Sequence, residues 1–544
     1  LGMGLSESRE QHTGGGLDPG PFGDDEIQTL SRVHELLRGT NTDGLPFQSF
    51  QRLLGVSGHG HFARLLFQLF LRWERYPEMP TMDPVSSGSG LAAPLVSLQR
   101  FVNGVGGCGR AASSVGLRVL WETSRVRPPS LEGDADEPGP GPGAAAPSVP
   151  RVDGTGEESS TSEHGGADDS SSDVRSREEL SALIALCEVL AQSQGPTGED
   201  VHVYEKFLQD EGNEVPPSAE LWTPSSTGLV ESVWSHAAKV GGLKQVHRGA
   251  THVQGVTFPA FADWSAIQCP LLHLSLVTLI QARCFSPWTG HSGLTNGLQL
   301  PKLDQPSAIL TGKPDLCAGL FGLASAAVEL QGPWARLYTS SEDGLSFSRL
   351  VHSVLGYTGP SILIIEDEEG AIFGGFAASG WRESNSFSGR PGCFLFRMRP
   401  TFSVYRPRLP RGEQHFMYLN QRGFALPRGL GFGGRLDNFR LFLPESFDGG
   451  VCRSRCLTYE AGPLAQSNSP ASMEGGLEFG IRSVEVWGCG GIDAVQAAKS
   501  SQAKTRQQKA ASIEKARKVD KAKFWENTFD REFLLGKTAG AGGR

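Results

Sequence analysis

The sequence predicts a multidomain α+β protein with a helical first half and a strand-rich C-terminal half. The chain has 544 residues, too many for one ordinary hydrophobic core, so several domains are expected. Apolar residues recur at helical spacing up to about residue 295, and from Trp334 onward they alternate as in strands. A stretch rich in Pro, Gly and Ser interrupts the helical pattern at about residues 126–176.

These changes in pattern divide the chain into six predicted segments. They are a disordered N-terminus (1–23), an EF-hand-like helical module (24–110), a disordered acidic linker (126–176), a helical domain (177–295), a β-sandwich with flanking helices (300–491) and a basic helical tail (492–544).

Composition excludes several classes of protein. The formal net charge of −9 argues against a general nucleic-acid binder, which needs a basic surface. Nine cysteines without a CxxC pair are typical of reduced thiols in a reducing compartment. We find neither the ~20 apolar residues of a membrane helix nor a secretory leader. A cytoplasmic chain is therefore expected.

The N-terminal segment has two alternative interpretations. If translation begins at Met3, Gly4 becomes terminal and Ser8 follows four residues later, which is the pattern for N-myristoylation. The alternative is a plain disordered tail.

The first helical module contains a loop similar to that of an EF-hand. Asn41, Asp43 and Gly44 fall at loop positions 3, 5 and 6, but Gly39 and Phe50 occupy positions 1 and 12. A calcium loop needs Asp and a bidentate Glu at those two places. We therefore expect a degenerate EF-hand scaffold that does not bind calcium.

The segments on either side of the linker boundary differ in apolar content. Residues 126–176 have too few apolar side chains to offset the entropy of ordering. After them Leu180, Leu183, Ile184, Cys187 and Leu190 form one helical face.

The C-terminal half alternates as strands do. Ile362–Ile365 is a continuous apolar run, as in a buried central strand. A turn at Asp367–Gly370 and the run Ala371–Phe376 complete a hairpin. Near the end the apolar phase slips by one residue before Val484, which indicates a bulge. Two packed sheets are predicted.

Several short motifs in this half follow one another in a particular order. They include Trp334…Leu337-Tyr338, Ile364-Ile365-Glu366-Asp367, Phe373-Gly374-Gly375-Phe376, Cys456-Leu457-Thr458-Tyr459 and Val484-Glu485-Val486-Trp487. Together their order and spacing resemble the TLDc family over about residues 300–491. The motif positions singled out by the resemblance are Gly344, Glu366, Gly374, Gly375, Phe396, Gly434, Glu485 and Trp487.

The resemblance implies a non-enzymatic regulatory protein. Its flanking segments are similar to the myristoylated, lysosomal mTOR-associated subgroup and the fungal restriction-of-telomere-capping relatives. The family resemblance implies binding to the vacuolar H⁺-ATPase, with its catalytic sector as the expected partner, and the subgroup implies a link to lysosomal mTOR signalling. It also implies a cytoplasmic location, with peripheral attachment to the lysosome or vacuole through an N-terminal myristoyl group.

The tail differs from the rest of the chain in charge. Residues 492–544 contain 12 Lys and Arg against 6 Asp and Glu. Trp525, Phe529 and Phe533 follow at helical spacing and are candidate anchors for a protein partner. Lys515, Lys518 and Lys521 are the accompanying basic candidates. A solvated helix and attraction to an anionic membrane are the alternatives.

No residue pattern in the chain predicts a catalytic, metal or cofactor site. Gly429–Gly434 fits GxGxxG, but alternation after it favours a Gly-rich loop between strands over a dinucleotide site. Two further functions stay open: an oxidative-stress protein using the thiols of Cys452, Cys456 and Cys489, and a hydrolase using Glu485.

Overall fold

A computed structural model describes the parts of the chain discussed below. They are residues 17–41, 43–55, 60–80, 94–124, 173–193, 201–209, 227–248, 251–289, 297–311, 313–408, 414–422, 425–465 and 476–491, with short stretches between 493 and 515. The chain forms two compact units. The helical unit comprises Leu1–Leu221, Val233–Ala266 and His273–Gly297, and the sheet unit comprises Trp222–Ser232, Ile267–Leu272 and Leu298–Arg544.

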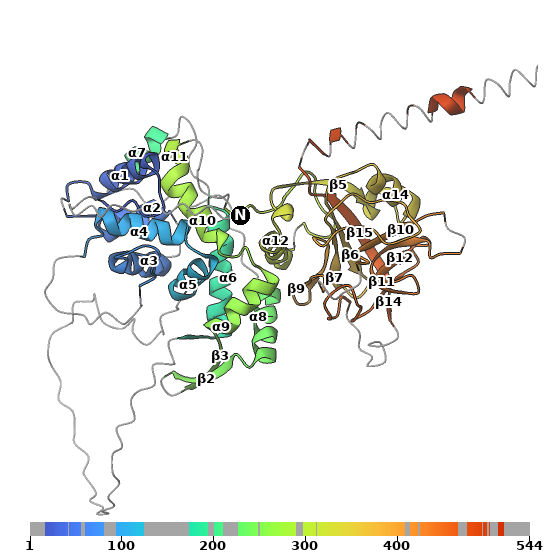
Figure 1. The fold of residues 1–544 in the computed structure, drawn as a ribbon, viewed down its shortest axis with the longest axis horizontal. Helices are drawn as coiled ribbons and strands as arrows, with labels where there is room; N and C mark the ends of the chain where they lie inside the picture. The colour runs from blue at the N-terminus through green and yellow to red at the C-terminus, as the bar shows by residue number, and fades with distance from the viewer. Residues whose placement is uncertain are drawn as a thin grey trace, which may run out of the picture. The chain divides into compact units, whose positions relative to one another are not determined.

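Helices make up most of the first unit (Figure 1). They are α1 (Asp24–Arg38), α2 (Phe47–Leu54), α3 (Gly60–Arg72), α4 (Leu98–Gly109), α5 (Ser113–Thr123), α6 (Arg177–Ala191), α7 (Val201–Gln209), α8 (Thr227–Val240), α9 (Phe258–Gln268), α10 (Leu274–Ile280), the π-helix η4 (Gln281–Phe285) and α11 (Ser286–Thr289). The segments that the sequence analysis separated into an EF-hand-like module and a helical domain thus belong to one compact unit, apart from short stretches of α8 and α9.

The first four helices form two helix–loop–helix pairs. The loop before α2 and the segment before α4 are joined by two main-chain hydrogen bonds between Leu45 and Val96, of 2.9 and 3.0 Å. The buried ring of His34 on α1 lies against the same place, with Nε2 2.9 Å from the Val96 carbonyl oxygen. Paired loops of this kind fit an EF-hand-like scaffold.

Two segments predicted to be disordered are partly ordered. Leu17–Gly23 are described, and Phe22 is buried with its ring 5.8 Å from that of Phe285. Asp173–Ser176 are also described, because β1 (Val174–Arg175) pairs with a strand and Ser176 caps α6. The Ser176 hydroxyl accepts from the Glu179 N–H, and the Glu179 carboxylate accepts from the Ser176 N–H.

The middle of the chain also contains a small sheet that the sequence analysis did not predict. Strands β2 (Leu243–Arg248) and β3 (Thr251–Thr257) form a hairpin, and β1 joins the other edge of β3 in the order β1-β3-β2. Apart from this sheet, residues 177–295 are mainly helical in their described parts.

The sheet unit holds two larger sheets. The seven-stranded sheet has the order β4-β5-β15-β6-β7-β8-β9, and the five-stranded sheet has the order β10-β11-β12-β13-β14. The strands are β4 (Lys302–Leu303), β5 (Pro333–Thr339), β6 (Ser361–Asp367), β7 (Ile372–Ala377), β8 (Phe394–Arg399), β9 (Ser403–Tyr405), β10 (Met417–Asn420), β11 (Gly429–Arg435), β12 (Asn438–Pro444), β13 (Gly450–Cys452), β14 (Leu477–Phe479) and β15 (Ile481–Gly488). The helices are α12 (Pro314–Ala326), η5 (Val328–Leu330), α13 (Ser340–Asp343) and α14 (Phe347–Leu355).

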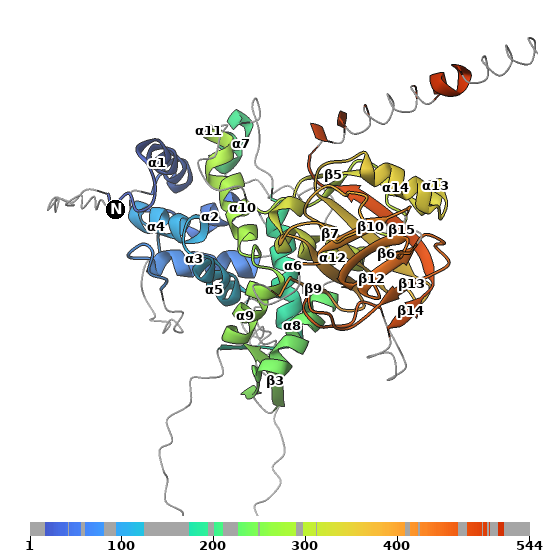
Figure 2. The same cartoon turned by 45° about the vertical axis from the view of Figure 1, so that its right-hand side comes forward.

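The predicted apolar run forms the central strand of the larger sheet. Every residue of β6 is buried, and β6 lies between β7 and β15 (Figures 1 and 2). The predicted slip in phase coincides with a register shift between Ile481 and Ser483. It also follows a change of sheet, because β14 belongs to the smaller sheet and β15 to the larger one.

The two sheets pack face to face, and α12 covers the other face of the larger sheet. Between the sheets, the Phe373 and Phe479 rings lie 5.0 Å apart. On the opposite face, a Cβ added to Gly319 of α12 would lie 2.5 Å from Met398. The sandwich is therefore covered by a helix on one side.

The interpretation of Gly429–Gly434 as a loop is wrong, because these residues form most of β11. The strand is buried except at its last residue and pairs with β10 and β12. Its glycines leave room for aromatic rings on the neighbouring strand: a Cβ on Gly429 would lie 2.5 Å from Phe442, and one on Gly431 2.9 Å from Phe439. Glycine here serves close packing within a sheet.

Candidate functional site

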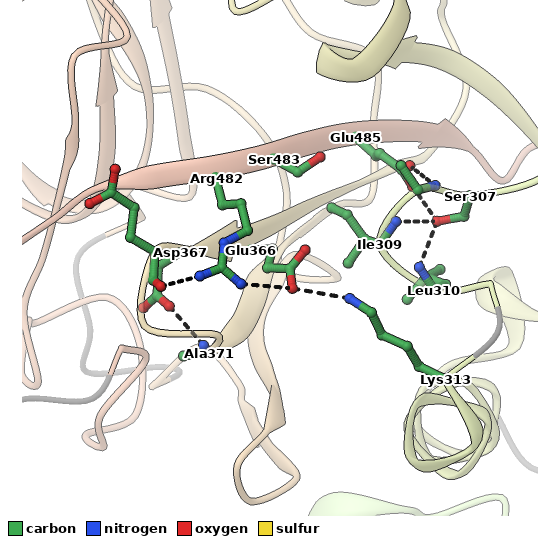
Figure 3. A network of polar contacts seen from close by, with 12 residues as sticks. Ser307, Ile309, Leu310, Lys313, Glu366, Asp367, Ala371, Arg482, Ser483 and Glu485 are labelled. Atoms are coloured by element: carbon green, nitrogen blue, oxygen red, sulfur yellow. Dashed lines mark hydrogen bonds and ion pairs between the residues drawn. The ribbon is translucent and has the colours of Figure 1, made fainter.

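The motif residue Glu485 lies at the centre of a buried polar network on β15 (Figure 3). Its carboxylate accepts hydrogen bonds from the Ser307 hydroxyl at 2.6 Å and the Ala308 N–H at 2.7 Å. The Trp487 indole N–H, two residues along the same strand, donates at 3.0 Å. Both carboxylate oxygens are therefore occupied by donors, and the side chain has no exposed surface.

The partner of Glu485 is a tight turn that leads into α12. Besides donating to Glu485, the Ser307 hydroxyl accepts from the N–H groups of Ile309 at 3.2 Å and Leu310 at 2.8 Å. This hydroxyl uses its donor and both acceptor positions. Glu485 thus fixes the turn to the face of the sheet that α12 covers.

A second carboxylate, Glu366, lies on the same face at the end of β6. Its Oε1 is 3.0 Å from the Lys313 ammonium and 3.7 Å from the Arg482 guanidinium. The Glu366 side chain is 9% exposed, whereas those of Lys313 and Arg482 are 31% and 53% exposed. The result is a buried acid held by two cations at the rim of the network.

The turn between β6 and β7 is closed by Asp367. Its carboxylate accepts from the Ala371 N–H at 2.7 Å, and the Gly370 N–H donates to the Asp367 carbonyl at 3.1 Å. Burial raises the pKa of Asp367, partly offset by these backbone donors. Arg482 donates to the Glu368 carbonyl on this turn, which ties it to β15.

This geometry suits a structural role for the acids. A general base must reach a substrate proton, and Glu485 is covered on all sides by its own donors. Within the described residues, no group of three or more His, Cys, Asp or Glu side chains could hold a metal ion. The same part of the chain includes no helix long and apolar enough to cross a membrane.

The other motif residues lie in packing positions. Gly344 has φ +70° after α13 and accepts from the Tyr338 hydroxyl at 2.6 Å. In β7, a Cβ on Gly374 would lie 1.8 Å from the Leu363 carbonyl oxygen, and one on Gly375 2.6 Å from Phe432 of the other sheet. Phe396 is buried in β8, and Gly434 has φ +83° at the end of β11.

Most candidate partner-binding residues of the tail lie outside the described residues. Only Lys515 is described, and it is exposed on a short helical stretch. Lys518, Lys521, Trp525, Phe529, Phe533 and the candidate lipidation residue Gly4 belong to parts of the chain that the structure does not describe.

Two of the three candidate redox cysteines are buried. Burial raises the pKa of the Cys452 thiol, and it raises that of Cys489 well above its ordinary value. Cys456 is half-buried, and its sulfur accepts from the Tyr459 N–H at 3.1 Å. Of the three, Cys456 is the most accessible.

Sequence reasoning missed the residues that hold the two motif acids. Ser307 and Ala308 are almost 180 residues from Glu485 in the chain, and Lys313 is 53 residues from Glu366. No local spacing connects residues so far apart. The one available signal was a buried strand carrying an acid, which requires a partner somewhere in the fold.

Comparison with known proteins identifies the class of the sheet unit. Residues 314–490 match the family model of the TLDc domain, so this chain carries a TLDc domain with the fold described above.

The TLDc segment is similar to particular proteins. It is 36% identical over 166 residues to mTOR-associated protein MEAK7 of Xenopus laevis, covering 30% of this chain and 34% of that protein. It is 32% identical over 190 residues to human MEAK7, covering 34% and 39%. With oxidation resistance protein 1 of Xenopus tropicalis it shares 27% identity over 158 residues, covering 28% and 16%. The chain thus spans about a third of the length of the MEAK7 relatives it matches.

Proposed function

We propose that this chain is a non-enzymatic regulatory protein whose TLDc domain and tail bind the catalytic sector of the vacuolar H⁺-ATPase. The observation that carries the proposal is the environment of Glu485. The motif acid best placed for chemistry is fully buried and has both oxygens bonded. The motif therefore supports a rigid scaffold, and binding is left to the surfaces.

The similarity to MEAK7 supports a link to mTOR signalling. Those relatives are named for their association with mTOR, and we extend that association to this chain as part of the proposal. Attachment to the lysosomal or vacuolar membrane would come from a myristoyl group on Gly4. A single myristoyl group gives only weak, reversible membrane binding. Binding to the protein partner would therefore supply the remaining affinity for the membrane.

The binding experiment uses the full chain and the purified catalytic sector of the vacuolar ATPase. Aromatic anchors dominate interfaces, so Trp525→Ala should weaken binding by about 2 kcal/mol, roughly thirtyfold. Phe524→Ala is the matched control, because Phe524 is an adjacent aromatic that lies off the stripe of Trp525, Phe529 and Phe533. Lys→Gln changes at Lys515, Lys518 and Lys521 should slow association and reduce its dependence on salt.

Equal binding by wild type and Trp525→Ala, with both chains folded, would contradict the role of the tail. The proposed membrane attachment is tested by Gly4→Ala, which should move the protein from membranes to the soluble fraction. If mass spectrometry finds an unmodified N-terminus, the proposed membrane attachment fails, whereas the proposed binding to the ATPase is unaffected.

A second candidate function, thiol-based resistance to oxidation, is favoured by the surroundings of Cys456. The neighbouring Arg440 is fully buried, donates to the Gly462 carbonyl at 2.5 Å, and has no hydrogen-bond partner for Nε or Nη1. Burial lowers the pKa of Arg440, and the nearby Cys456 opposes that effect. A partly accessible sulfur thus lies near a buried guanidinium, and its accessibility distinguishes Cys456 from the buried Cys452 and Cys489.

Peroxide treatment of the full chain followed by mass spectrometry tests this candidate. The Cys456 thiolate would attack peroxide, gain one oxygen as sulfenic acid and release hydroxide. Cys489 is the internal control, because it is buried and burial raises the pKa of its thiol well above the ordinary value. Equal modification of both cysteines, or of neither, would contradict the candidate.

A further inference from the structure

Strand β2 forms an edge of the small sheet in the helical unit, and its outer side is open. The strand order β1-β3-β2 leaves that side without a neighbouring strand in the described part of the chain. Strand β2 lies at the margin of the helical unit (Figure 1). It pairs with β3 in regular register, from Leu243 opposite Val256 to Arg248 opposite Thr251. The edge therefore has neither the bulge nor the proline that would prevent a further strand from pairing.

The other edge strands of the described chain are short or closed by main chain. Beside β9, the Phe402 N–H donates to the Gly228 carbonyl at 3.1 Å, and residues 406–408 bond to residues 458–460. Beside β10, Ser388 and Met417 exchange two main-chain bonds, of 2.8 and 3.0 Å. Strands β1, β4 and β14 have two or three residues. Among the described strands, β2 is thus the one edge of more than four residues that the chain leaves open.

The ladder between β2 and β3 identifies the peptide groups on the outer side. The Thr257 N–H donates to the Gly242 carbonyl at 3.0 Å, and bonded and non-bonded pairs alternate along an antiparallel ladder. The Lys244 N–H therefore points to β3, whereas the N–H and C=O groups of Leu243 and Gln245 point outward. The Lys244 and Gln245 side chains are exposed, and Leu243 is half-buried. A strand that approaches from solvent can reach these peptide groups.

The charge of this region selects the kind of strand that would pair there. Residues 232–262 contain three Lys and Arg side chains and no Asp or Glu, although the whole chain has a net charge of −9. Asp263, the next acid along the chain, is bound to His236 at 2.8 Å. Lys244 is exposed and has no ion pair with another described residue. A second copy of β2 would bring like charges together, whereas an acidic strand would complement them.

We propose that the outer edge of β2 is a docking site for an extended acidic segment of a partner protein, which pairs with the main chain at Leu243 and Gln245. Main-chain bonds supply the affinity and the register, and Lys244 supplies the preference for acidic side chains. The site belongs to the helical unit. It therefore depends neither on the tail nor on the ATPase being the partner.

The binding test uses the full chain and a labelled peptide of alternating Glu and Val as the probe. Gln245→Pro removes an N–H that faces solvent, so the hairpin should stay folded. The probe loses a ladder bond in this variant and should bind about tenfold more weakly. Gln245→Ala is the matched control, because it loses the same side chain but keeps the N–H, and its affinity should equal that of wild type. Lys244→Glu should weaken binding about threefold and reduce its dependence on salt.

Hydrogen exchange tests the edge in the wild-type chain, so it does not depend on a variant that folds. In the free chain the Leu243 and Gln245 amides should exchange faster than those of Lys244 and Val246, which bond to β3. The probe should slow the two fast amides. If Leu243 and Gln245 exchange slowly in the free chain, another part of the chain already covers the edge and the proposal fails.

Three other results would also overturn the proposal. The first is equal binding of the probe by Gln245→Pro and Gln245→Ala, with both variants melting as wild type does. The second is equal binding of a peptide of alternating Lys and Val. The third is a wild-type chain that sediments as a dimer and a Gln245→Pro chain that sediments as a monomer, which would assign the edge to a second copy.

Discussion

The sheet unit and the helical unit each bury a glutamate side chain, and the surroundings of the two carboxyl groups differ. Glu485 in the sheet unit has donors on both oxygens. Glu188 on α6 is 2% exposed, and its Oε1 has no hydrogen-bond partner. Burial raises the pKa of Glu188 from 4.5 to about 7.

This difference shows that burial alone does not define the role of an acid. Glu485 stabilises the fold by joining β15 to the Ser307 turn, because its donors replace the water it has lost. Glu188 lacks full compensation, so its charged form is disfavoured. The first acid connects distant parts of a domain, and the second makes its own unit sensitive to pH.

The largest effect is expected from removing the acid that has partners. Glu485→Leu would leave the Ser307 hydroxyl, the Ala308 N–H and the Trp487 indole N–H without their acceptor. Breaking such a buried set should cost about 4 kcal/mol of unfolding free energy. Denaturant unfolding of the sheet unit within the full chain measures this loss of free energy. A loss under about 1 kcal/mol would contradict the idea that Glu485 stabilises the fold through its donors.

The opposite sign is expected for Glu188→Gln. The folded pKa is raised, so the contribution of Glu188 to stability is complete below 4.5 and is lost as the pH rises to about 7. At about pH 8 the amide should therefore stabilise the helical unit by about 3 kcal/mol, and at about pH 4.5 by only about 0.4 kcal/mol. Melting curves at both pH values test this. Glu178→Gln, an exposed acid on the same helix, is the control.

A smaller effect is expected from replacing residues 125–172 with a short flexible linker. Ser124 lies just before this segment and Arg175 shortly after it. Both side chains donate to the Trp121 carbonyl oxygen, at 3.0 and 2.9 Å. The segment thus leaves and returns at the same place in the helical unit. Shortening such a loop about sixfold should stabilise the unit by about 1–2 kcal/mol. Loss of the melting transition of the helical unit would contradict the prediction that this segment is only a linker.

The smallest expected effect is that of calcium on the helical unit. Phe50 occupies loop position 12 and is 1% exposed, with its ring 5.0 Å from that of Phe70. No ligand can be supplied from that position, so calorimetry of the full chain should show no binding at this loop below about millimolar calcium. A micromolar site lost on Asp43→Ala would contradict the prediction.

Strands with a clear apolar pattern could be predicted from the sequence. Ile362–Ile365 forms the centre of the larger sheet, and Phe394, Phe396 and Met398 are buried along β8. The pattern succeeded because each of these strands buries whole faces of side chains.

The sequence failed where partners are distant or side chains are missing. Gly429–Gly434 has few side chains to alternate, so its strand is defined by Phe439 and Phe442 on the neighbouring strand. The β2–β3 hairpin was missed because it mixes polar and apolar residues without strict alternation. Ser307 could not be connected to Glu485, because the bond depends on the finished sheet.

The position of β15 has a consequence for how the protein is made. This last strand lies between β5 and β6, so each of these two strands has one unpaired edge until residues 481–488 have been synthesised. The larger sheet cannot close during translation of its first six strands, and the apolar β6 needs protection in that interval. The helical unit ends at Gly297, so all of its residues have been synthesised well before β15. A nascent chain stalled before residue 481 should therefore carry a folded helical unit beside a sheet unit that recruits chaperones.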